Sequence, residues 1–150
     1  MDKIDNQILN KLQQDASLSQ RELADRLHLS QNACWRRLQK LTAAGVLKGS
    51  RAVIDPAAIG LNLTVMVMIR TRHHDDKWAA RFRARVESIP EITDFWRIGG
   101  EWDYMAKVTT TSMAGYDAVY KRLIQDLDLE RVTGIFTMET IFADRPLSLP

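Results

Sequence analysis

The sequence predicts an α+β protein of two domains: an N-terminal (winged) helix-turn-helix domain and a C-terminal ferredoxin-like domain of βαββαβ order. Apolar residues recur at helical spacing in the first part of the chain, and the spacing changes to that of strands from Leu61. The charge changes as well: residues 1–60 hold nine Lys and Arg against six Asp and Glu, whereas residues 61–150 hold twelve against thirteen. We therefore place the boundary after Gly60, giving domains 1–60 and 61–150.

Three short helices are predicted in the first domain. Residues 2–14 carry apolar side chains at helical spacing. Ser19, with Glu22 at the reciprocal capping-box position, starts a second helix, and Ser30 starts a third. The second and third helices are separated by a short break, which is typical of a helix-turn-helix motif that places a helix in the DNA major groove.

The third helix and the segment after it are basic. Five Lys and Arg and no Asp or Glu lie between His28 and Arg51. Such an imbalance favours DNA, since neutralising phosphates releases counterions; the alternative is the solvated basic face of a helical bundle. The capped helix spacing favours the DNA interpretation. The candidate DNA contacts are Arg21, Ser30, Gln31, Asn32, Trp35, Arg36, Arg37, Lys40 and Arg51.

Different roles are expected within this set. Gln31 and Asn32 should read base edges, because the first turn of a recognition helix reaches the groove, while Arg37 should hold the phosphate backbone. Trp35 either contacts a thymine methyl group or sugar, or packs on the wing or linker, and the sequence favours neither. Cys34 falls on the inner stripe of the helix, where a thiol behaves as a small hydrophobe rather than as a nucleophile.

A short wing is predicted after the third helix. Residues 46–48 and 51–54 can form a hairpin around Gly49 and Ser50. Asp55-Pro56 starts a turn, and residues 57–59 form a connecting segment that leads to Gly60.

The second domain is predicted from alternating and helical spacings in turn. Strands are expected from residue 61, over 92–98, over 102–109 and over about 132–142, with helices ending at Pro90 and beginning after Ser112. This order places both helices on one sheet face. The other face is uncovered and carries Met66, Met68, Met105 and Met138, which predicts a sheet-to-sheet homodimer.

The turn Gly99-Gly100-Glu101-Trp102-Asp103 is the candidate small-molecule site. Its glycines leave backbone N–H groups open to a carboxylate, and Glu101 and Asp103 can take an ammonium group. The alternative is a tight hairpin with solvated acids. Residues 73–76, HHDD, are expected to be a polar loop rather than a metal site, because adjacent strand residues point to opposite faces.

Several classes of protein are disfavoured. No nucleophile–base, His–carboxylate or metal constellation is present, so we expect no enzyme, metal or cofactor. Met1 is followed by charged residues, and no apolar run approaches the ~20 residues of a membrane span, so we expect a cytoplasmic, nucleoid-associated protein without a membrane partner.

Five motifs cover essentially the whole chain in a fixed order. They are DNQIL from Asp5, LS…CWRRLQKL…GVL from Leu29, AVIDPAAIGL from Ala52, GGEWDYMAKV from Gly99 and the terminal RPLSLP. Together they resemble the Lrp/AsnC family, the leucine-responsive/asparagine or feast/famine regulators. The resemblance implies a helix-turn-helix domain tied to an amino-acid-binding domain, in homodimers that bind palindromic double-stranded DNA operators and assemble to tetramers, octamers or larger.

The resemblance also extends the candidate effector site. It favours the ligand-loop interpretation of Gly99, Gly100, Glu101, Trp102 and Asp103, and it adds Thr137, at a small-hydroxyl position seen in relatives. The implied function is a sequence-specific transcriptional regulator whose operator binding or assembly is modulated by a small amino acid. The alternative is an architectural DNA-binding protein without an effector. The pieces KxIDxxIL, HHxxxW and FWRxxGEWDY further resemble a subgroup that includes regulators of cysteine detoxification, which implies a sulfur-containing or small amino acid.

Overall fold

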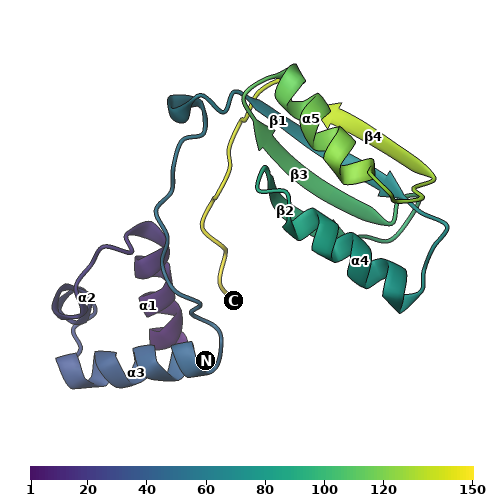
Figure 1. Ribbon diagram of the computed structural model, residues 1–150. Helices are drawn as coiled ribbons and strands as arrows, with labels where there is room; N and C mark the ends of the chain where they lie inside the picture. Colours follow the sequence, from purple (N-terminus) through teal and green to yellow (C-terminus); the bar gives the residue numbers. More distant parts are fainter. The chain divides into compact units, whose positions relative to one another are not determined.

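A computed structural model describes all 150 residues, and the chain forms two compact units (Figure 1). The first unit comprises Met1–Val53 and Ile141–Pro150, and the second comprises Ile54–Thr140. This corrects both predicted domain limits. Gly60 is not a boundary but the left-handed C-cap of the short 3-10 helix η1 (Ala57–Ile59), and the chain end belongs to the first unit.

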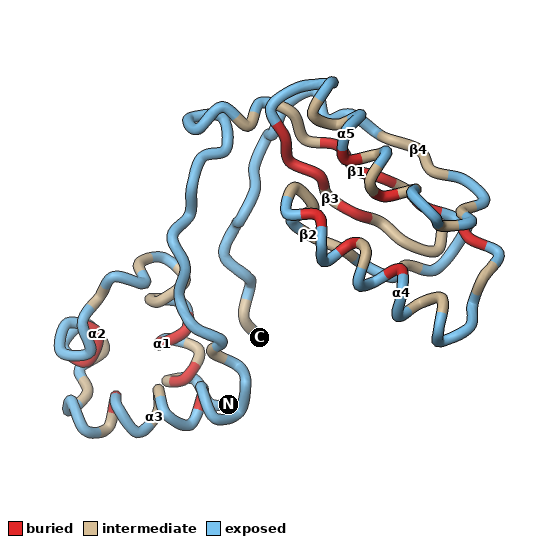
Figure 2. The backbone as a smooth tube through the Cα atoms, viewed as in Figure 1, coloured by how far each residue is buried: buried red, intermediate tan, exposed pale blue.

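Three helices make the core of the first unit: α1 (Lys3–Gln14), α2 (Gln20–Arg26) and α3 (Gln31–Ala43). The predicted caps are present: the Ser19 hydroxyl accepts the Glu22 N–H, and the Ser30 hydroxyl accepts the Ala33 N–H. Between α2 and α3 the chain turns at His28, whose φ is 54°. The helices bury one small apolar cluster, and its buried positions are coloured red in Figure 2. The cluster consists of Ile8, Leu9, Leu23, Ala24, Cys34 and Leu41.

The wing hairpin predicted after α3 is not formed. Residues 46–54 contain no strand, and Val53 and Ile54 are 80% and 61% exposed. An isolated two-stranded hairpin is only marginally stable in water, and this one has no third strand or helix to cover its apolar side chains. The segment instead runs as an extended connection to η1.

The second unit has the predicted βαββαβ order. Its elements are β1 (Leu63–Arg70), α4 (Asp76–Glu87), β2 (Ile92–Arg97), β3 (Tyr104–Thr110), α5 (Met113–Ile124) and β4 (Arg131–Phe136). The antiparallel sheet has the order β2-β3-β1-β4, which confirms the ferredoxin-like arrangement. Strand β4 ends six residues before the predicted limit at residue 142: its last pair is Phe136 with Val65, and only Thr64 and Leu63 of β1 lie beyond that pair.

The two faces of the sheet differ. Both helices cover the face that carries Val65, Val67 and Ile69, where Phe82 of α4 and Val119 of α5 complete the core (Figure 2). The opposite face, the outer sheet face, is not covered by any element; registers place Met66, Met68, Met105, Trp96 and Ile135 on it. Met138 was expected there but follows β4 and is 98% exposed. None of the helices combines the length and the apolar character needed to cross a bilayer.

Candidate nucleic-acid interface and effector loop

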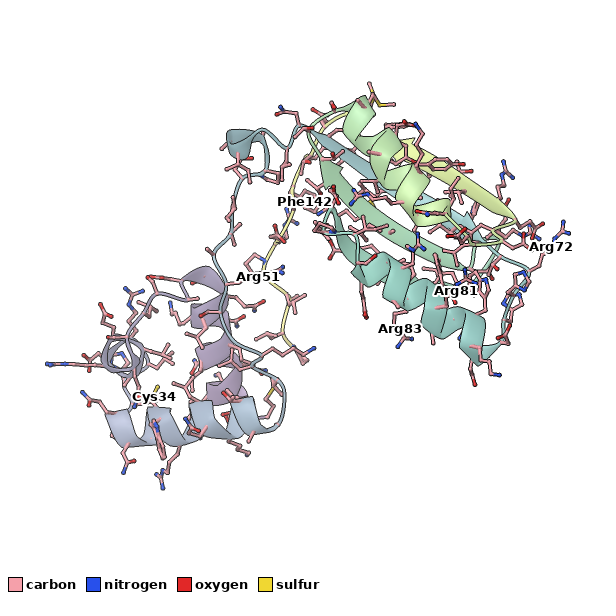
Figure 3. The ribbon with its side chains drawn as sticks, viewed as in Figure 1. Cys34, Arg51, Arg72, Arg81, Arg83 and Phe142 are labelled. Carbon is pink, nitrogen blue, oxygen red and sulfur yellow. The ribbon has the colours of Figure 1, made fainter.

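Helix α3 presents a polar, acid-free surface. Gln31, Asn32, Arg36 and Lys40 are exposed, and Trp35 is 48% exposed. On the opposite side of the helix Cys34, labelled in Figure 3, is fully buried, which confirms its place in the core. Burial raises the pKa of the Cys34 thiol, so the thiolate form is disfavoured there.

The cations of this surface have no internal partners. Arg36, Lys40 and Arg51 form no salt bridge, and Arg51 lies on the exposed segment after α3 (Figure 3). Arg21 on α2 is also exposed, with its Nε 4.0 Å from the Asp25 carboxylate. Unpaired cations beside a helix that carries no acid are suited to phosphate groups, because no internal salt bridge must be broken first.

One residue that the sequence analysis did not select helps to hold the two helices of the motif together. The Gln20 side-chain amide donates to the Gln31 carbonyl oxygen at 3.2 Å, which connects the start of α2 to the start of α3. A glutamine after a helix cap has many possible roles, so no signal in the sequence indicates this bond.

The structure corrects the role expected for Arg37. Its Nη1 donates to Asp2 Oδ2 and to Asp5 Oδ1, both at 2.7 Å, and its side chain is 28% exposed. Arg37 therefore ties α3 to the N-terminus of α1 instead of presenting its charge to DNA. The position borders the inner stripe of Cys34 and Leu41 at helical spacing, which is why the inward-facing role is possible.

The carboxylates of this ion cluster are held in their charged forms. The pKa of Asp5 is lowered chiefly because its carboxylate accepts the Asp2 N–H, and Arg37 adds to this effect while burial opposes it. The pKa of Asp2 is lowered chiefly by the Asp5 N–H and then by Arg37. The two aspartates form a capping box on α1, so one cluster both starts α1 and fixes α3 against it.

In the second unit, the loop Gly99–Asp103 connects β2 to β3 and is anchored through Asp103. The Thr71 N–H donates to Asp103 Oδ2 at 2.8 Å, and the Asp103 N–H donates to the Ile69 carbonyl at 3.0 Å. Gly100 has a φ of 120°, a conformation that favours glycine. The N–H groups of residues 99–102 make no hydrogen bond within the chain, so they are open to an anion.

Two charged groups border this loop. Glu101 is exposed and forms no salt bridge. The Arg131 guanidinium at the start of β4 lies over the Trp102 ring, 5.2 Å from its centroid. Arg131 was missed by the sequence analysis because it is far from the loop in sequence and meets it only through strand pairing. A groove of this unit lies elsewhere, between α4 and β2, and none of residues 99–103 lines it.

Thr137 does not lie with the loop. Its N–H and its hydroxyl both donate to the carbonyl of Thr64, at 3.1 and 3.0 Å, at the start of β1. The loop is bonded to Thr71, beyond the other end of β1. At about 3.3 Å per residue these ends are more than about 20 Å apart. A single chain therefore cannot join Thr137 and the loop in one site, contrary to the grouping that the resemblance implied.

The polar segment before α4 has structural roles. The Asp75 carboxylate accepts the Trp78 N–H and caps α4, while His73 Nε2 lies 2.9 Å from Asp128 Oδ2. His73 also stacks on Trp78, with ring centroids 5.8 Å apart. These contacts agree with the polar loop that was predicted.

Comparisons with protein families match both units. The description "Lrp/AsnC ligand binding domain" matches residues 64–147, and "Winged helix-turn-helix DNA-binding" matches residues 1–48. Among curated proteins, the chain is 44% identical over 142 residues to the DNA-binding transcriptional activator DecR of Escherichia coli K12, covering 94% of this chain and 93% of that protein. It is 40% identical over 150 residues to the glutamate uptake regulatory protein of Zymomonas mobilis, covering 100% and 92%.

Solved structures agree with the fold over the full length. An AsnC family transcriptional regulator from Agrobacterium tumefaciens superposes with a TM-score of 0.91 at 39% identity, covering 100% of this chain and 97% of that one. The transcriptional regulator NMB0573 from Neisseria meningitidis, in complex with L-Met, superposes with a TM-score of 0.90 at 28% identity, covering 99% and 96%.

Proposed function

The chain belongs to the Lrp/AsnC family of DNA-binding transcriptional regulators, and we propose that it binds a palindromic operator as a homodimer and responds to a sulfur-containing or small amino acid. A regulator of this family has a DNA-binding domain and an amino-acid-binding domain and is not an enzyme. The observation that carries the proposal is the surface of α3, where Gln31, Asn32, Trp35, Arg36 and Lys40 are exposed and no acid is present.

The polar residues of α3 divide into two classes that a binding experiment can separate. Gln31→Ala should lose about 1–3 kcal/mol at one base pair of the operator, because an amide reads base edges, with little change on unrelated DNA. Arg36→Ala should weaken binding to all sequences alike and lower the slope of log affinity against log salt by about one unit, because it removes a phosphate contact.

Both effects can be measured by fluorescence anisotropy with a duplex selected from a random-sequence library and its scrambled counterpart, at several salt concentrations. Thr42→Ala, an exposed position near the end of α3, serves as the control and should behave as the unaltered protein. An unchanged sequence preference in Gln31→Ala would contradict the proposed reading role.

The proposed dimer forms through the outer sheet face. Its apolar side chains belong to β1, β2, β3 and β4, so the patch extends across the whole sheet, and Trp96 and Ile135 are 41% and 54% exposed on it. Asp94 and Lys107 lie beside these apolar side chains on the same face. An uncovered apolar surface of this kind is typical of a homodimer interface. Two-fold symmetry of the protein would then match a palindromic operator. Further assembly of dimers would bring two chains to the region of the effector loops, where a residue such as Thr137 of another chain can be supplied.

The proposed effector site is the loop Gly99–Asp103. The open N–H groups and Arg131 can hold a carboxylate, and Glu101 can hold an ammonium group. Asp103 contributes less to holding the ammonium group than its charge suggests, because one of its carboxylate oxygens already accepts the Thr71 N–H. The Neisseria relative was solved with L-Met, which supports a sulfur-containing amino acid as the first probe.

Gly100→Leu is expected to weaken L-methionine binding at least about tenfold, because a side chain would stand where the carboxylate approaches the open N–H groups. Isothermal titration calorimetry measures this directly. Gly49→Leu is the matched control: its φ is 125°, so it carries similar backbone strain in the other unit and should bind as the unaltered protein does. Full-strength binding by Gly100→Leu would place the effector elsewhere.

A thermal-shift screen with the twenty amino acids identifies the effector if L-methionine does not bind. A ligand at a hundred times its dissociation constant stabilises the folded protein by about 2.7 kcal/mol. An architectural DNA-binding protein without an effector would show no shift with any amino acid and no change of operator affinity, which distinguishes the two functions.

A further inference from the structure

We propose that the C-terminal segment, Ile141–Pro150, is a strap that completes the DNA-binding unit and stabilises its helix α1. The chain leaves the first unit after Val53, builds the second unit, and returns to the first at Ile141. The DNA-binding unit is therefore made from both ends of the chain.

Polar contacts fix the segment along α1. The Gln13 side chain forms two hydrogen bonds to one residue: its Oε1 accepts the Leu147 N–H at 2.7 Å, and its Nε2 donates to the Leu147 carbonyl at 3.2 Å. Asn6 Nδ2 donates to the Pro150 carbonyl at 2.5 Å. Asn6 and Gln13 are seven residues apart, which is close to two helical turns, so they lie on one face of α1. The segment thus follows the helix axis in an extended form.

An apolar contact adds to these bonds. Leu149 is half-buried and packs against the helical core of the first unit, whereas Leu147 is 73% exposed. Pro146 and Pro150 restrict the backbone of the free segment, so less conformational entropy is lost when it docks. Docking therefore combines specific bonds, apolar burial and a preorganised backbone.

The other end of the strap is fixed in the second unit. Thr137 donates its N–H and its hydroxyl to the Thr64 carbonyl, immediately after β4. Nine exposed residues, 138–146, separate this anchor from Leu147, the first residue of the strap that contacts α1. Nine extended residues span about 30 Å, so the strap is held on α1 by its own contacts and not by tension from the second unit.

The test compares Leu149→Asp and Gln13→Ala with their matched controls, Leu147→Asp and Gln14→Ala, in the full-length protein. Leu147 and Gln14 have exposed side chains and adjoin the residues that make the contacts. Hydrogen exchange resolved to single residues should show the Leu147 amide exchanging about tenfold faster in the two test variants, with a lower unfolding midpoint of the first unit. Both controls should match the unaltered protein. Fast exchange of the Leu147 amide in the unaltered protein would overturn the docking.

Discussion

Asp5→Ala is expected to destabilise the DNA-binding unit more than any single change on its surface. The Asp5 side chain is 2% exposed and accepts both the Asp2 N–H at 3.0 Å and the Arg37 guanidinium at 2.7 Å. Its removal leaves the Asp2 N–H without its acceptor and Arg37 with Asp2 as its only partner, at a cost of about 1–3 kcal/mol. For a unit of this size each kcal/mol lowers the unfolding midpoint by about 4–8 °C, which scanning calorimetry resolves. Operator affinity should fall too, because α3 is then attached to the start of α1 through the Arg37–Asp2 pair alone.

The same cluster predicts a pH dependence. The pKa values of Asp2 and Asp5 are lowered in the folded state, so both carboxylates bind protons less readily there than in the unfolded chain. Their stabilisation is therefore complete above the unfolded pKa of about 4 and is lost as the pH falls below it. The unfolding midpoint of the first unit should decrease more steeply below about pH 4 in the unaltered protein than in Asp5→Ala.

Asp25→Ala is the control for this experiment. Asp25 is an exposed aspartate whose only ion pair, with Arg21, is long and solvated, so the midpoint should change little. An Asp5→Ala protein that melts like Asp25→Ala would show that the cluster does not hold the helices together.

Met68→Arg is expected to abolish the homodimer. Met68 lies near the centre of the outer sheet face, between Met105 on β3 and Thr133 on β4. Dimerisation through this face would bury the arginine without a partner, and a penalty of about 3 kcal/mol corresponds to more than about a hundredfold in the dissociation constant. Sedimentation velocity over a range of concentrations should show monomers, and operator binding should weaken because the two half-sites are no longer bound together.

Met113→Arg separates this effect from a general effect of charge. Met113 is 57% exposed at the start of α5, which covers the other face of the sheet. It should leave the dimer intact. Circular dichroism melting of both variants verifies the fold. A folded Met68→Arg protein that remains dimeric at micromolar concentration would exclude the outer sheet face as the interface.

Features set by neighbouring residues could be predicted from the sequence. The caps Ser30 and Ser112 accept N–H groups three residues away. Strand alternation puts Val65, Val67 and Ile69 on the face opposite Met66 and Met68, and the structure buries them there. The role of Arg37 could not be predicted, because its partner Asp5 is 32 residues distant and helical periodicity leaves a border position ambiguous.

In the candidate sites, too, the features set by neighbouring residues could be predicted. The exposed residues of α3 could be predicted from helical periodicity, and Gly100 could be predicted from the turn, which needs a residue with positive φ. Arg131 reaches Trp102 only because β4 and β3 both pair with β1, and the strap depends on Gln13 and Leu147, which are 134 residues apart. Contacts of such separation leave no local pattern in the sequence.

The return of residues 141–150 to the first unit affects the order in which that unit is assembled. During translation the three helices emerge first, yet Leu147, Leu149 and Pro150, which contact them, are added only after the second unit. Closing a loop of this length is slow compared with helix formation, so the DNA-binding unit reaches its final form only after the second unit has been synthesised. A chain that stops before Leu147 would keep the helix-turn-helix but lack the contacts of this segment with α1. The DNA-binding unit is therefore completed only after the regulatory domain has been synthesised.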